Sequence, residues 1–299
     1  MSSERVIVIP DIWKTEAGID IARLSRIQPG YSFLFMPALN VKSKKQLSLM
    51  YQQLLREIKV SSALFILPKC FATGINVRYW PDLVYDFAHG VTVTSVHFAD
   101  KWSECLKFVD TCMNEHEYTT ERYHATCQYQ HPYTDSLKLW VEAGAHNLHP
   151  GDYSRDEFLS ALKSMQGHWM YWGHADGRRL RGYHHVTSDD LLSHAPASPL
   201  RSTLWFSCST LDFRLKRNIA LDWYLTGSTH CLLASKEPVI TEANQMLSAA
   251  WLSAMRQAKA STIVEIVHHL ILSDSITFKT VLKNYRLLGY PWISMSHVF

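Results

Sequence analysis

The chain has 299 residues, of which 47% are hydrophobic and 19% charged, with a formal net charge of +3. This composition is that of a globular protein with a large core, and the near balance of charges does not predict a nucleic-acid or membrane-surface partner. No apolar run approaches the roughly 18 residues of a membrane span, and residues 1–13 lack the apolar segment of a secretory signal. We therefore expect a cytoplasmic protein whose six cysteines are reduced thiols.

The first half alternates short β-rich runs with helical segments. Strands are predicted over 5–10, 31–39, 62–68 and 90–98, and amphipathic helices over 43–58, with Ser43 as the cap, and 99–113. This order predicts an α/β fold with a mainly parallel sheet. The polar segment 114–135 is interpreted as a connection, which gives domains over 1–133 and 134–299. His124, Cys127 and His131 within it are too few for a zinc site, because no CxxC partner follows.

The second half is more regular. Helices are predicted over 136–144, 153–165, 186–195, 217–228 and 240–258, and strands over 168–173, 202–208 and 229–235. Two of the helices begin with the spacing of a capping box, at Ser154 and Glu157 and at Thr187 and Asp190. Strand–helix crossovers of this length predict parallel pairing with right-handed connections.

A histidine and a cysteine each follow one of these buried strands. His174 ends the run 168–173, and Cys208 ends the run that starts at 202. Reactive groups of open α/β sheets lie just past the carboxyl ends of strands, so an imidazole and a thiol are expected at one edge. An imidazole can deprotonate a thiol to the nucleophilic thiolate, and the N–H groups of Ala175 and Cys208 could donate to an oxyanion.

The structural alternative is open for each residue alone. A free cysteine at a strand end is commonly a small core residue, and His174 beside Trp172 can be a packed aromatic. Cys231, at the start of a predicted strand, is interpreted in that way. The occurrence of His174 and Cys208 at the ends of consecutive strands is what favours catalysis.

Two short segments resemble the motifs of the caspase-like cysteine peptidases of clan CD. These are MYWGHADG (170–177) and LWFSCST (204–210), and the resemblance is greatest to bacterial CHAT domains and separase. Segments 143–162, 223–243 and 285–293 agree with it in order and spacing. The resemblance covers about residues 136–295. It implies a three-layer caspase-like sandwich, with an inactive, pseudo-caspase N-terminal half packed on the catalytic half.

The resemblance further implies a cysteine endopeptidase that cleaves a protein substrate. Cys208 would be the nucleophile and His174 the general acid/base, with no metal and no cofactor. It also suggests a place in bacterial defence or regulated proteolysis, under the control of a sensor partner or an upstream protease.

The sequence departs from the family pattern at two places. Ala175 replaces a glycine after the histidine, and the loop 235–243 has Glu237 where CHAT domains tend to have tryptophan. Glu237 in a substrate pocket would favour a basic side chain, although it can equally be a solvated loop residue. Asp176 and Asp212 lie close to the motifs and could orient the imidazole or contact a basic substrate residue, or be solvated.

Two other functions compete with proteolysis. The first is an inactive caspase-like scaffold that binds a partner, which the replacement at Ala175 favours. The second is a nucleic-acid module built on GRRLRGYHH (177–185), which the nearly neutral charge of the chain disfavours. His184, His185 and His194 have no fourth ligand at suitable spacing, so no zinc site is predicted there.

Overall fold

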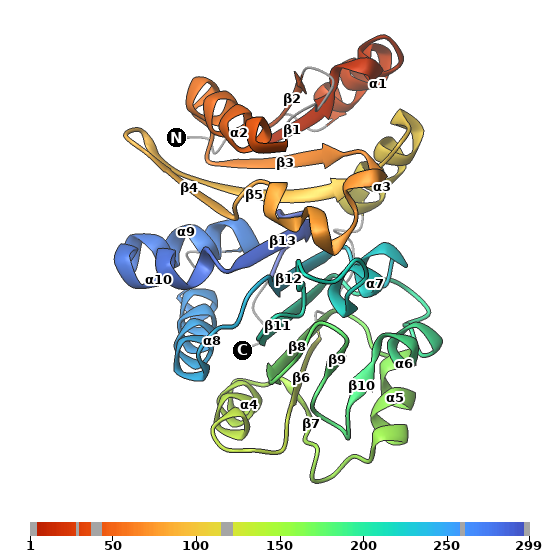
Figure 1. The fold of residues 1–299 in the computed structure, drawn as a ribbon, viewed down its shortest axis with the longest axis vertical. Helices are drawn as coiled ribbons and strands as arrows, with labels where there is room; N and C mark the ends of the chain where they lie inside the picture. The colour runs from red at the N-terminus through yellow and green to blue at the C-terminus, as the bar shows by residue number, and fades with distance from the viewer. Residues whose placement is uncertain (1–4, 28–29, 37–43, 115–121, 258–260, 296–299) are drawn as a thin grey trace.

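The computed structural model describes residues 5–27, 30–36, 44–114, 122–257 and 261–295. Its main sheet has eleven strands in the order β2-β1-β3-β5-β13-β12-β11-β8-β6-β7, with β4 paired to β5 (Figure 1). These strands are β1 (Arg5–Pro10), β2 (Tyr31–Met36), β3 (Ser62–Leu67), β4 (Val84–Phe87), β5 (Gly90–Phe98), β6 (Tyr123–Cys127), β7 (His146–Leu148), β8 (His168–Gly173), β11 (Ser202–Ser207), β12 (Cys231–Ser235) and β13 (Tyr285–Gly289). A separate two-stranded sheet pairs β9 (Arg179–Leu180) with β10 (Val186–Thr187).

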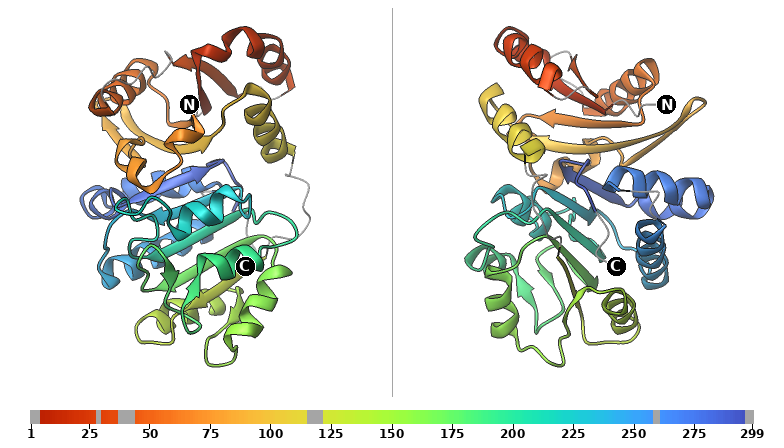
Figure 2. Two further views of the ribbon diagram at one scale, coloured as in Figure 1. Left: turned by 45° about the vertical axis from the view of Figure 1, so that its right-hand side comes forward. Right: turned by 180° about the vertical axis from the view of Figure 1, so that it is seen from behind.

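The helices of the described residues surround this sheet, as the views in Figure 2 show. They are α1 (Lys14–Ile27), α2 (Lys44–Ile58), α3 (Trp102–Asn114), α4 (Tyr133–Glu142), α5 (Arg155–Lys163), α6 (Ser188–Ser193), α7 (Ile219–Leu225), α8 (Thr241–Arg256), α9 (Ile263–Ser273) and α10 (Ser275–Leu282), with short 3-10 turns η1 (Asp11–Trp13), η2 (Lys69–Phe71) and η3 (Gly74–Tyr79). None of the described helices is both long and apolar enough to cross a membrane.

Alternating side chains of the strands form one core on each face of the sheet. Met170 and Trp172 of β8 belong to the core that α1, α3, α4, α8, α9 and α10 cover. Trp169 and Tyr171 of the same strand belong to the core under α2, α5, α6 and α7. Successive side chains of a strand point to opposite faces, so a continuously apolar strand can be buried on both sides. The predicted three-layer α/β architecture is confirmed.

The pairing is mainly parallel, as predicted, and β13 is the strand that joins the two halves. It runs antiparallel to β12 and parallel to β5, where Leu288 pairs with Val96. Arg286 of β13 is 2% exposed and forms an ion pair with Asp82 of the N-terminal half. The closing strand of the chain is thus inserted between the two halves and makes one continuous sheet of them.

Most predicted elements occur where the sequence placed them, and both predicted capping boxes are present. The interpretation of 114–135 as a connection is wrong in its second part, because Tyr123–Cys127 form β6 between β8 and β7. Polar neighbours hide this strand in the sequence, but the Thr126 hydroxyl donates to the Met170 carbonyl within the sheet. Ser43, the predicted cap, and residues 37–39 lie outside the described residues. The division into domains at 133 stays a prediction.

Candidate active site

His174 and Cys208 leave the sheet at the same level on neighbouring strands. β8 and β11 are parallel, and their last paired residues are Gly173 and Ser207, which directly precede His174 and Cys208. Neighbouring strands lie about 4.8 Å apart, so the backbones of the two residues emerge side by side. A side chain at Gly173 would put its Cβ 2.3 Å from the Tyr171 hydroxyl oxygen, which explains the glycine before the histidine.

The backbone of His174 is fixed by hydrogen bonds on both sides. Its N–H donates to Oε1 of Gln128 at 3.0 Å, and its carbonyl accepts from the Arg181 N–H at 3.0 Å and the Tyr171 hydroxyl at 3.2 Å. Gln128 follows directly after β6, on the other side of β8 from β11. These bonds fix the backbone of His174, and the residue is only partly buried.

Tyr133, the first residue of α4, lies between the imidazole of His174 and Thr241, the first residue of α8. Its hydroxyl is 3.2 Å from Nε2 and 3.3 Å from Nδ1 of His174, and 3.1 Å from Oγ1 of Thr241. Burial raises the pKa of Tyr133, its hydrogen bond with Thr241 lowers it, and a negative charge on nearby Cys208 would raise it further. The hydroxyl therefore stays protonated as a neighbour of both predicted catalytic residues. Sequence reasoning missed Tyr133 because nothing local distinguishes it from other core tyrosines.

Cys208 is partly buried, and its thiol donates a hydrogen bond to the Val239 carbonyl at 3.0 Å. The next residue, Ser209, has φ of 47°, a left-handed conformation that costs a non-glycine residue about 1–2 kcal/mol. Two bonds hold it there: its N–H donates to Oγ of Ser235 at 2.8 Å and to the Glu237 carbonyl at 3.2 Å. Backbone strain that the surroundings over-determine is typical of functional turns.

The two predicted oxyanion donors are the N–H groups of Ala175 and Cys208. Ala175 and Leu180 form an antiparallel bridge whose hydrogen bonds are made by the residues on either side, so the Ala175 N–H points away from β9. Within the described residues, the Ala175 N–H donates to no backbone carbonyl. The Cys208 N–H follows the last pair of β8 and β11, Gly173 and Ser207, and the role of both N–H groups toward an oxyanion stays a prediction.

Neither Asp176 nor Asp212 is a free carboxylate. Asp176 accepts from Nε of Arg179 at 3.0 Å and lies 3.8 Å from Nη2 of Arg181. Asp212 is 4% exposed and accepts from the backbone N–H, Nε and Nη2 of Arg214 at 2.7–2.9 Å. Burial acts to raise the pKa of Asp212, but the hydrogen bonds and charge of Arg214 lower it below its ordinary value. Both carboxylates are engaged by arginine.

Glu237 contributes its backbone to the site. Its carbonyl accepts from Ser209 and from the Ser235 hydroxyl, whereas its carboxylate lies 3.9 Å from Nζ of Lys236 on a side chain that is 46% exposed. The predicted role of Glu237 in a substrate pocket stays a prediction.

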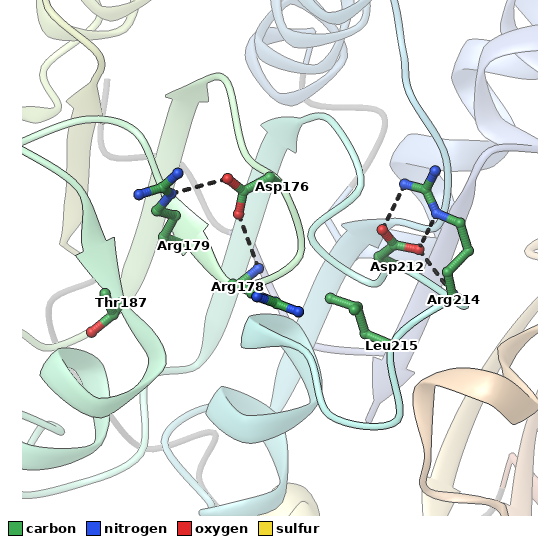
Figure 3. A pocket seen from close by; sticks show the side chains of 7 residues that line it. All are labelled: Asp176, Arg178, Arg179, Thr187, Asp212, Arg214 and Leu215. Carbon is green, nitrogen blue, oxygen red and sulfur yellow. Dashed lines mark hydrogen bonds and ion pairs between the residues drawn. The ribbon is translucent and has the colours of Figure 1, made fainter.

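The two strand-end loops enclose a cavity of about 620 Å³. Figure 3 shows its lining, which comes from the segment between His174 and α6 and from the loop after Cys208: Asp176, Arg178, Arg179, Thr187, Asp212, Arg214 and Leu215. The loops meet at Gly177, whose φ is +76° and where a Cβ would lie 2.7 Å from Cβ of Asp212.

The other cysteines differ from Cys208 in their surroundings. Burial raises the pKa of Cys105 and of Cys127 to about 12 and raises that of Cys231 as well, so these residues stay thiols. Cys70 is exposed on η2. Among the described residues no three His, Cys, Asp or Glu side chains gather as metal ligands would.

Several solved structures share this fold. The complex of the pro- and mature domains of Porphyromonas gingivalis RgpB matches with a TM-score of 0.71 and 9% identity, over 99% of this chain and 80% of that one. The Arg-specific cysteine proteinase gingipain R (RgpB) matches with a TM-score of 0.68 and 9% identity, over 98% of this chain and 78% of that one. Saccharomyces cerevisiae separase, in its complex with securin, matches with a TM-score of 0.53 and 10% identity, over 83% of this chain and 17% of that one.

The sequence itself matches no family model and no curated protein. The greater likeness to CHAT domains therefore stays a prediction. The layered sheet, its strand order and these structural neighbours agree on one conclusion: the chain has the caspase-like fold of gingipain R and separase.

Proposed function

We propose that this protein is a cysteine peptidase in which Cys208 is the nucleophile and His174 the general acid/base. The observation that carries the proposal is the register of β8 and β11, whose last pair is Gly173 and Ser207. His174 and Cys208 follow this pair directly, so their backbones leave the sheet at the same level of one edge. The fold is shared with gingipain R, an Arg-specific cysteine proteinase, and with separase.

The roles follow from the groups around the site. The thiol proton passes to His174, and the thiolate forms a C–S bond to the scissile carbonyl carbon. The N–H groups of Ala175 and Cys208 would stabilise the oxyanion. The imidazolium then protonates the leaving amine as the C–N bond breaks. Water, deprotonated by the imidazole, hydrolyses the thioester and restores the thiol.

Two contacts of these residues bear on the proposed steps. Tyr133 contacts both nitrogens of the His174 ring and thereby restricts its orientation. The thiol of Cys208 donates to the Val239 carbonyl, so its proton has to be redirected toward the imidazole before attack. From the resemblance alone we extend the proposal to a protein substrate, control by a sensor partner or an upstream protease, and a role in bacterial defence. The cytoplasmic location expected from the sequence belongs to the same proposal.

The decisive experiment removes the thiol. We expect Cys208→Ala to lower cleavage of a peptide library by about a thousandfold or more, because no other group at the site can form the thioester. Cys70→Ala is the matched control, since Cys70 is the other cysteine that is not buried, and it should cleave at the wild-type rate. Circular dichroism checks that both variants are folded. Wild-type cleavage by Cys208→Ala would refute the proposal.

A second candidate, an inactive scaffold that binds a protein partner, is favoured by Ala175 and by the bond from the thiol to Val239. The rate of alkylation separates the two functions. An activated Cys208 reacts with iodoacetamide at pH 6 much faster than Cys70, because the neutral thiol is unreactive. Equal rates at the two cysteines would favour the scaffold.

A further inference from the structure

The cavity between the two strand-end loops carries an excess of positive charge. We call it the arginine pocket and define it by Arg178, Arg179, Arg214, Asp176 and Asp212, which line it together with Thr187 and Leu215. Each aspartate already accepts hydrogen bonds from an arginine, Asp176 from Arg179 and Asp212 from Arg214. Three guanidinium groups therefore face two carboxylates that are already paired.

The arginines retain donors that no described residue uses. A guanidinium has five N–H groups, and Arg179 uses Nε toward Asp176 while Arg214 uses Nε and Nη2 toward Asp212. The exposed side chain of Arg178 forms no ion pair with a described carboxylate; only its backbone N–H contacts Asp176, at 3.3 Å. Arg178 thus carries an uncompensated charge beside two arginines whose orientation is already fixed.

The position of the pocket relates it to the proposed chemistry. One wall follows directly after His174 and Ala175, and the other follows Cys208 after the short turn through Ser209. The walls touch where Gly177 packs on Asp212. The walls of the pocket thus follow the two proposed catalytic residues in the chain, its lining includes neither His174 nor Cys208, and about 620 Å³ is ample space for a substrate side chain.

We propose that the arginine pocket binds a carboxylate side chain of the substrate, with Arg178 as its main partner. This inference rests on the proposed function. Guanidinium groups bind carboxylates through paired, charge-assisted hydrogen bonds, which gives both geometry and charge selectivity. The ion pairs of Asp176 and Asp212 hold Arg179 and Arg214 in place, so the pocket is organised before the ligand arrives. The predicted pocket of Glu237 lies on the loop after β12 and concerns a different substrate side chain.

The test uses fluorescent octapeptide libraries in which one position at a time is fixed as Glu, Gln or phosphoserine. We expect the wild-type protein to cleave the Glu library with a kcat/KM about tenfold above the Gln library at one position near the cut. In Arg178→Gln this ratio should fall below about three. Arg56→Gln on α2 removes the same charge from an exposed site in the N-terminal half and should keep the wild-type ratio.

Binding to the Cys208→Ala variant, measured by fluorescence polarisation, separates this inference from the proposed function. If Glu peptides bind more tightly than Gln peptides and this difference depends on Arg178, the pocket is supported even when the wild-type protein cleaves no peptide. The absence of cleavage would then overturn only the proposed peptidase activity. Cleavage without a Glu-over-Gln preference would overturn the pocket alone. A preference for phosphoserine without one for Glu would overturn the carboxylate assignment in favour of a phosphorylated residue.

Discussion

Gly177 is the point at which the loop after His174 packs against the loop after Cys208. Its φ of +76° lies in the left-handed region, and a Cβ there would lie 2.7 Å from Cβ of Asp212 and 2.9 Å from Cδ1 of Leu215. Gly227, after α7, has the same φ of +76° but open space around its Cβ position. Alanine at the two positions therefore separates the effect of backbone strain from the effect of close packing.

The expected magnitudes follow from these surroundings. Gly227→Ala meets only the left-handed strain, which costs about 1 kcal/mol of unfolding free energy. Gly177→Ala meets the same strain and adds a methyl group to a tightly packed contact, which costs a further 1–3 kcal/mol, roughly. We therefore expect Gly177→Ala to lower the unfolding free energy by about 2–4 kcal/mol. Because the contact fixes the distance between the two loops, peptidase activity should fall in this variant and stay near wild type in Gly227→Ala.

Urea unfolding followed by circular dichroism measures both variants, and peptide cleavage below the unfolding transition measures the functional effect. Two results would contradict these expectations. If the two alanine variants lose the same stability, within about 0.5 kcal/mol, the close approach of the two loops contributes nothing beyond backbone strain. If Gly177→Ala also cleaves like wild type, the packing of the loops does not position the catalytic residues.

Two further predictions concern Asp212 and Tyr133. Arg214 lowers the pKa of Asp212 in the folded state, so this carboxylate stabilises the protein above its unfolded pKa of about 3.9 and stops doing so as the pH falls through the lower folded value. Asp212→Asn should thus lower the unfolding free energy by about 1–2 kcal/mol at pH 7, as measured by urea unfolding. The difference from wild type should shrink below about pH 4. A loss of stability that does not depend on pH would contradict this prediction. Tyr133→Phe removes the hydroxyl group that lies between Thr241 and His174. We expect kcat for peptide cleavage to fall about tenfold, with KM nearly unchanged and at most about 1 kcal/mol of unfolding free energy lost. A kcat within twofold of wild type would show that the hydroxyl does not position the imidazole.

The sequence alone predicted the features that depend on local physics. Alternating and continuous apolar runs gave the strands, and the capping boxes at Ser154 and Thr187 gave two helix starts, because a side chain and a backbone amide three residues apart meet without any tertiary contact. The order of strands and helices also gave the parallel sheet. It followed that His174 and Cys208, each directly after a buried strand, emerge at one edge.

Elements without a distinctive local pattern escaped prediction. β6 looked like a polar connection, since only its pairing with β8 and β7 satisfies Thr126 and buries Tyr123. The position of β13 between β12 and β5 could not be predicted either, because pairing partners far apart in sequence are chosen by the packing of the whole sheet. That single strand turns two halves into one continuous layer.

The environment of the site is likewise a tertiary property. The sequence suggested Asp176 and Asp212 as partners of the imidazole or of a basic substrate, but each pairs with a nearby arginine of its own loop, Arg179 and Arg214. Tyr133, far from both motifs in the chain, reaches His174 because α4 begins beside the end of β8. The chain order thus determined which residues lie at strand ends, whereas the packing of α4 beside β8 and α8 decided that the Tyr133 hydroxyl lies between His174 and Thr241, since these contacts join segments whose spacing no local pattern encodes.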